Sequence, residues 1–182
     1  MKIKKVSKIL ILLGALITLF STFFLSFAQT NGLDGRTYAS GIGFLFNLPS
    51  IISDVSYWEA FNGGEVGVIY IVSIVFIVFL LAGIIQLVGL INKYVALIGS
   101  IIVIGVSIAI ILAITVNISG WDMSVYSTLL WAPPIADGIW PLDVPVVETS
   151  GLFYQNLSLG TITLIIGGGL GFTGGILNFK DL

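Results

Sequence analysis

Residues 66 to 118 read VGVIYIVSIVFIVFLLAGIIQLVGLINKYVALIGSIIVIGVSIAIILAITVNI, and Lys93 is the only charged residue among them. A helix rises 1.5 Å per residue, so about 20 apolar residues cross the roughly 30 Å hydrocarbon core of a bilayer. The stretches 66–91 and 94–118 are both long enough. Only Asn92 and Lys93 separate them, and Asn tolerates the left-handed conformation that ends a helix. The run therefore predicts two transmembrane helices in a tight antiparallel hairpin.

Two further uncharged stretches reach spanning length, at residues 9–28 and 157–177. The whole chain of 182 residues is 57% hydrophobic and only 9% charged, far below the roughly 25% charged residues of soluble proteins. We therefore predict an all-α membrane protein with four transmembrane helices in a compact bundle. Residues 1–182 form a single four-span domain, with two external loops of about 37 residues each, at 29–65 and 119–156.

Charged residues are segregated between the two ends of the predicted bundle. Lys and Arg in short loops favour the cytoplasmic side. With both termini inside, six of seven cations are cytoplasmic and eight of nine acids are external. The exceptions are Arg36 outside and Asp181 inside. This agreement predicts a multi-pass protein of the cytoplasmic (plasma) membrane with internal N- and C-termini.

The first span has a second interpretation. A basic start, an apolar stretch and then FLSFAQT also resemble a secretory signal, with Ser26 and Ala28 as the small residues before a cleavage point. The apolar run from Ile9 to Leu25 is longer than the usual signal core of about 7 to 15 residues. We therefore favour a retained helix, and cleavage after residue 28 stays the alternative.

The fourth span contains LIIGGGLGFTGGIL at residues 164–177, where six of the nine residues from Gly167 to Gly175 are glycine. Each glycine costs up to about 1 kcal/mol relative to alanine inside a helix. Close helix contacts recover that cost, and the spacing predicts one contact stripe formed by Gly160, Gly167, Gly171 and Gly175. Gly168, Gly169 and Gly174 fall off it. The stripe fits packing within the chain, a self-association seam, or a hinge or non-helical pore element.

Polar side chains are few within the spans, and none of them is ionisable. Gln86 is the most prominent, because a side-chain amide needs a partner inside the bilayer. We expect an interhelical hydrogen bond worth roughly 1 kcal/mol. The fourth span also carries threonines at positions 161, 163 and 173.

The external loops combine short structural elements with aromatic residues. The spacing of Ile51, Val55 and Trp58 predicts an amphipathic helix over residues 49–61, either a lid on the span ends or an interfacial or partner-binding helix. MSVYSTLLW and VPVVET suit short strands. The tryptophans form a membrane-interface belt or an external docking surface: Trp58, Trp121, Trp131 and Trp140. Two sequons fall on the predicted outer side, at Asn117 and Asn156.

The chain lacks the residues that most enzymes use. It contains no Cys and no His, and no convincing acid pair or metal-ligand spacing, so we predict no catalytic residue, metal or cofactor. A net charge of −2 does not favour nucleic acid. The predicted function is a non-enzymatic assembly or accessory subunit, in contact with lipid and with other membrane subunits or its own copies. The alternative is an oligomeric passive pore lined by the fourth span.

The predicted layout is similar to that of claudins and tetraspanins, which also have four spans, internal termini and a short internal turn. The resemblance concerns layout alone. The first loop has no cysteine pair and no Trp-Gly-Leu-Trp run, and the second has no Cys-Cys-Gly sequence. The chain is therefore assigned to neither family.

Overall fold

The structure is a computed structural model that describes residues 2–32, 35–62, 65–115, 128–132, 141–148 and 155–178. The protein is mostly helical, as predicted. Four helices are long and apolar enough to span a membrane: α1 (Lys2–Phe24), α4 (Val66–Val88), α5 (Lys93–Thr115) and α7 (Leu159–Leu177). They confirm the four predicted spans and make the chain a multi-pass membrane protein.

The ends of the spans differ from the predicted boundaries by a few residues. Helix α1 includes the lysines that precede the apolar run and ends at Phe24, because Phe27 N already donates to Ala39 O at 2.7 Å as the chain becomes extended. Helix α4 ends at Val88, where Gly89 N donates to Ile85 O. Helix α7 begins at Leu159 because the residues before it form a strand. Residues 116–118 lie outside the described part of the third span.

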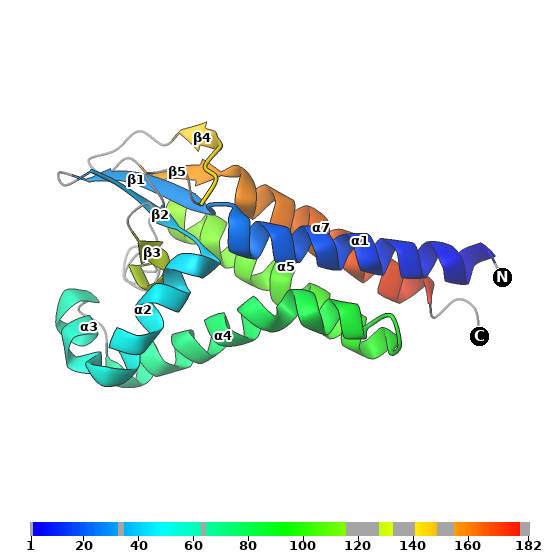
Figure 1. Cartoon of the computed structure of the whole chain (residues 1–182), viewed down its shortest axis with the longest axis horizontal. Helices are drawn as coiled ribbons and strands as arrows, with labels where there is room; N and C mark the ends of the chain where they lie inside the picture. Colours follow the sequence, from blue (N-terminus) through cyan, green and yellow to red (C-terminus); the bar gives the residue numbers. More distant parts are fainter. Residues whose placement is uncertain are drawn as a thin grey trace.

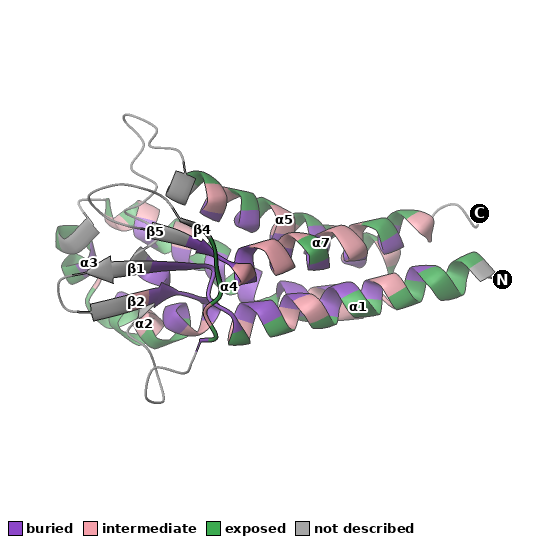
Figure 2. Cartoon of the chain, turned by 90° about the horizontal axis from the view of Figure 1, so that it is seen from above, coloured by how far each residue is buried: buried purple, intermediate pink, exposed green. Residues whose placement is uncertain are grey.

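Helices α1 and α7 lie side by side, and α7 also packs against α5 (Figure 1). Helices α4 and α5 form the predicted hairpin. The two termini lie at the same end of the bundle, and the other elements gather at the opposite end. Buried positions face the neighbouring helices while the outer faces are exposed (Figure 2). Those outer faces carry large apolar side chains such as Ile71 and Ile74 of α4, as contact with hydrocarbon requires.

A five-stranded sheet stands at the end of the bundle away from the termini, and the all-α prediction did not include it. Every described strand pairing is antiparallel, in the order β3-β2-β1-β5-β4. The strands are β1 (Ala28–Gly32), β2 (Gly35–Ala39), β3 (Trp131–Ala132), β4 (Pro145–Glu148) and β5 (Gln155–Ser158). Strand β4 confirms the strand expected in VPVVET. Both external loops contribute strands to this one sheet.

The predicted helix over residues 49–61 is two helices, α2 (Gly41–Ser53) and α3 (Val55–Asn62). Ser40 begins α2, because its Oγ accepts a hydrogen bond from Gly43 N at 3.0 Å. Pro49 therefore lies inside α2 rather than in a first turn. A second difference concerns MSVYSTLLW, whose described residues form the 3₁₀ helix η1 (Thr128–Leu130) and the short strand β3. We call the sheet, α2, α3 and η1 together the head.

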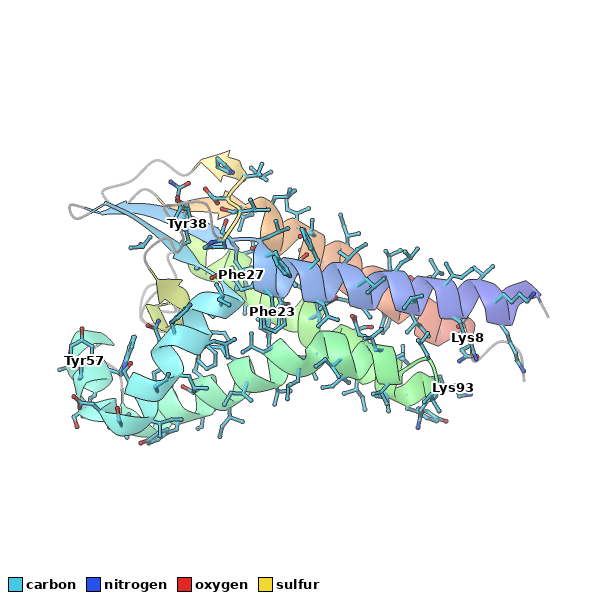
Figure 3. All side chains as sticks on the ribbon, in the orientation of Figure 1. Lys8, Phe23, Phe27, Tyr38, Tyr57 and Lys93 are labelled. Atoms are coloured by element: carbon cyan, nitrogen blue, oxygen red, sulfur yellow. The ribbon has the colours of Figure 1, made fainter. Side chains whose placement is uncertain are left out.

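One hydrophobic core joins the head to the spans. It contains Phe27 before β1, Phe44 of α2, Leu129 of η1 and Phe79 of α4. Phe27 meets Phe79 edge-on with ring centroids 5.8 Å apart, and Figure 3 places Phe27 near Phe23 where α1 meets the head. Such aromatic pairs contribute about 0.5–1.5 kcal/mol beyond their buried area. The head is thus packed on the bundle rather than tethered to it.

Candidate functional site

The glycines of α7 divide between two neighbouring helices. Gly160, Gly167 and Gly174 recur every seven residues; Gly167 and Gly174 face α1, and Gly160 faces Leu25 and Ser26, which follow α1. A methyl group at Gly167 would lie 2.7 Å from Thr18 Oγ1, and one at Gly174 would lie 2.8 Å from Ser7 O. At Gly160 the methyl group would collide with Ser26 O. Only a glycine lets two backbones approach this closely.

The remaining buried glycines of α7 face the hairpin: Gly168, Gly171 and Gly175. A methyl group at Gly171 would lie 2.5 Å from Ser100 Oγ and 2.8 Å from Gln86 Nε2, and one at Gly175 would lie 2.7 Å from Leu97 Cδ2. The four glycines predicted as one stripe therefore have different neighbours: Gly160 and Gly167 meet α1 and the segment that follows it, whereas Gly171 and Gly175 meet the hairpin. Two contact faces explain most of the glycine surplus.

Gly169 alone among the α7 glycines has open space around its missing side chain. It shares the exposed side of the helix with Ile166 and Thr173. All four predicted helix-packing glycines, by contrast, are buried inside the chain. The contacts shown are intramolecular, and a self-association seam has no support from these four residues.

Sequence reasoning missed Gly14, which makes the closest approach between α1 and α7. A methyl group there would lie 2.6 Å from both Gly167 O and Gly171 N, which are backbone atoms that no rotamer change can move. The available signal was an isolated glycine within an otherwise leucine- and isoleucine-rich span. Its position seven residues after Ser7, which also faces α7, marks the same helical face.

Hydroxyl groups complete the contact between α1 and α7. Ser7 Oγ donates to Gly174 O at 2.7 Å near the terminal end of the bundle. Nearer the head, Ser21 Oγ lies 2.7 Å from Thr163 Oγ1, and Thr161 Oγ1 donates to Phe27 O at 2.9 Å. Two of the three threonines proposed for a pore lining are thus bonded inside the chain. Only Thr173 is exposed.

Gln86 is completely buried where α4, α5 and α7 meet, and it forms the predicted interhelical contact. Its Nε2 donates to Ser100 Oγ at 3.1 Å, and Ser100 Oγ donates to Ala96 O at 2.7 Å within α5. The amide oxygen Oε1 has no partner among the described residues. Among the described residues, the amide of Gln86 is therefore hydrogen-bonded through its nitrogen and not through its oxygen.

Asp143 fastens the second external loop to the ends of α1 and α7. Its Oδ1 accepts hydrogen bonds from Ser158 Oγ at 2.5 Å and from Ser26 Oγ, and both serines are completely buried. Leu142 N also donates to Phe24 O at 2.8 Å. The sequence alone groups Asp143 with the other external acids. The two serines that bind it are 117 and 15 residues away in the sequence, so no local sequence pattern connects them with Asp143.

The four tryptophans predicted to form an interface belt or docking surface have different positions in the structure. Trp58 is 7% exposed and donates from Nε1 to Ser50 Oγ at 3.1 Å, so it is a core residue of the head rather than an external contact. Ile51 is completely buried in the same core. Trp131 lies in β3, opposite Ala39. Trp121 and Trp140 lie outside the described residues.

The two sequons fall at the limit of what the structure describes. Asn156 lies in β5, where the backbone pairs with Gln29 on one side and Glu148 on the other. Asn117 is outside the described residues. Within those residues, no group of three or more acidic side chains is placed to hold a metal ion.

Comparison with protein-family models, with curated proteins and with solved structures gives no match. The function of the chain is therefore inferred from its own structure. That geometry consists of close helix contacts, hydroxyl hydrogen bonds and the buried amide of Gln86, and a shared core joins the head to the spans.

Proposed function

We propose that the chain is a non-enzymatic membrane subunit that holds an external head in a fixed position and presents it to another protein for assembly. The observation behind this proposal is the single core shared by the head and the spans. A head packed through Phe27 and Phe44 onto α4 cannot swing on a linker. Fixed presentation lowers the ordering cost of binding a partner.

The proposed orientation follows the charges. Lys8 and Lys93 lie at the end of the bundle that also holds both termini (Figure 3). We assign this end to the cytoplasm, because basic residues in short loops stay inside. The head then lies outside the plasma membrane, within reach of other external domains.

Strand β4 offers the most suitable contact surface for a protein partner. It lies at one edge of the sheet, next to β5 alone. Leu142, Val144 and Val146 alternate along this segment and are 47%, 48% and 45% exposed. An exposed apolar edge is a template for strand addition by a partner chain.

The pore alternative has less support. A lining formed by the fourth span needs polar groups that face a lumen. Thr161 and Thr163 instead bond to groups of the same chain, and α7 lies between α1 and α5. Liposomes that hold the purified protein and show no ion flux would agree with this interpretation.

Site-specific photo-crosslinking tests the assembly proposal. A photoreactive residue at Val146 is expected to give a discrete protein adduct in the native membrane, whereas one at Glu59, exposed on α3, serves as the matched control. Val144→Asp should abolish the adduct while the protein remains folded. A protein without an adduct from Val146, and monomeric without partners in mild detergent by native mass spectrometry, would overturn the proposal.

A further inference from the structure

Helix α2, with the sequence GIGFLFNLPSIIS, contains no charged residue over its 13 residues. At 1.5 Å per residue it is about 20 Å long, too short to cross a bilayer. Uncharged apolar helices of this length are core helices or interfacial segments. The sequence prediction placed a helix at residues 49–61 of this external loop and did not include its first eight residues, from Gly41 to Leu48.

The first turn of α2 lies deep beside the spans. A methyl group at Gly41 would lie 2.5 Å from Thr22 O of α1 and 2.8 Å from Leu80 Cδ2 of α4. Leu80 is 14 residues from Val66, where α4 begins, which corresponds to about 21 Å along the helix. The beginning of α2 therefore lies far below the outer end of α4.

From this depth α2 runs beside the outer half of α4 (Figure 1). Phe44 meets Phe76 edge-on with ring centroids 5.4 Å apart, one turn further out on each helix. Helix α1 has already ended at Phe24, two residues beyond Thr22. Helix α2 thus occupies the outer part of the bundle that α1 does not reach.

Both the buried and the exposed side of α2 carry large apolar side chains, and the exposed side also carries Ser50 and Ser53. Phe44 and Ile51 are completely buried against the core. Leu45, Phe46 and Ile52 are 40%, 60% and 66% exposed. The exposed side chains of the adjacent α4 are equally apolar, with Ile71 63% and Ile74 60% exposed. The exposed face of α2 therefore continues the surface that α4 presents to lipid.

Two polar side chains within α2, those of Asn47 and Ser50, have protein partners. Asn47 Nδ2 donates to Leu129 O at 3.1 Å. Ser50 Oγ donates to Asn47 O at 2.8 Å and accepts from Trp58 Nε1. A helix in contact with hydrocarbon must satisfy such groups internally, because no water is present to bind them. A helix facing water has no such requirement.

We propose that α2 is a half-inserted helix whose exposed face, formed by Leu45, Phe46 and Ile52, contacts the acyl chains of the outer leaflet. This face is continuous with the lipid-facing surface of α4 and carries no charge. We therefore infer that lipid, rather than a protein partner, covers it. The first external segment then enters the membrane again after the β1–β2 hairpin. This inference does not depend on the proposed assembly role.

Spin labels measure this directly, because the chain contains no cysteine. Phe46→Cys is labelled in vesicles of phosphatidylcholine and phosphatidylglycerol, with Ile74→Cys as the lipid-facing control and Glu59→Cys as the water-facing control. We expect the Phe46 label to collide with oxygen and to avoid a water-soluble nickel chelate, as at Ile74. Leu45→Cys repeats the measurement on the same face should Phe46→Cys misfold.

Two outcomes would overturn the proposal. Nickel accessibility as high as at Glu59 would place α2 in water. Low accessibility to both reagents would show that a protein partner or a second copy covers this face.

Discussion

Gln86 of α4 donates from Nε2 to Ser100 Oγ of α5 at 3.1 Å, and Gly171 of α7 packs against both side chains. Three of the four spans therefore meet at one polar contact. A side chain at position 171 would displace the amide, so the glycine and the hydrogen bond depend on each other. The contact fixes the rotation of α7 relative to the hairpin.

Ser100→Ala tests the value of this contact. The substitution removes the acceptor of a buried amide N–H, and interhelical bonds of this kind contribute about 0.6 to 1.7 kcal/mol in membranes. We expect a loss of about 1 kcal/mol in unfolding free energy, measured by denaturant titration in mixed micelles. Ser107→Ala is the matched control, because Ser107 is equally buried on α5 but donates only to Val103 O of its own helix. Equal losses in the two variants would contradict the proposed role of Gln86.

The two environments of the α7 glycines predict opposite effects of the same substitution. Gly171→Ala places a methyl group 2.5 Å from Ser100 Oγ, and overpacking of this kind costs about 1–3 kcal/mol. Gly169→Ala enters open space and should stabilise the helix by up to about 1 kcal/mol through its better helix propensity. Unfolding titrations of the two variants side by side measure the difference. A stabilising Gly171→Ala would refute the close contact.

The spans and part of their contacts were predictable, because hydrocarbon thickness sets a length and a composition that the sequence displays directly. The division of the glycines was not, since residues 160, 167, 171 and 175 fit one stripe as well as two until the neighbours are known. Gly14 is the glycine of α1 that packs against α7, but no local sequence feature identifies α7 as its neighbour.

The sheet was harder to predict for a different reason. Its central pairing joins Ala28 to Leu157, across most of the chain, and β1 is a short segment, AQTNG, without apolar alternation. Asp143 illustrates the same limit, because its partners Ser26 and Ser158 are 117 and 15 residues away in the sequence. Nonlocal pairing of short polar strands leaves no period for sequence analysis to detect.

The first helix is expected to remain in the mature protein. Ala28, the proposed cleavage position, is completely buried in β1, which pairs with both β2 and β5. Removal of residues 1–28 would also eliminate Gly14 and the bond from Ser7 to Gly174. The intact mass of protein purified from membranes should therefore include this segment. A mass that lacks it would mean that α7 finds other neighbours.

The proposed orientation predicts which positions an impermeant thiol reagent reaches. Ile91 lies in the α4–α5 turn and is 92% exposed, while Glu59 is exposed on α3 in the head. With the head outside, Glu59→Cys should react in intact cells and Ile91→Cys only after permeabilisation. The reverse pattern would invert the protein in the membrane. Labelling of both in intact cells would indicate mixed orientation.

Asp143→Asn should weaken the attachment of the second loop to the spans. Hydrogen bonds to a charged group contribute about 1.5–3 kcal/mol, and the carboxylate accepts two from Ser26 and Ser158. Both hydroxyl groups donate to Oδ1, so an amide oxygen in its place can still accept both bonds but without the negative charge that strengthens them. We expect lower unfolding free energy and faster proteolysis of the head, with Glu59→Gln as the control for loss of one exposed external charge. Ser26 lies two residues after α1 and Ser158 directly precedes α7, so an unchanged rate of proteolysis would show that the helix contacts alone hold the head in place.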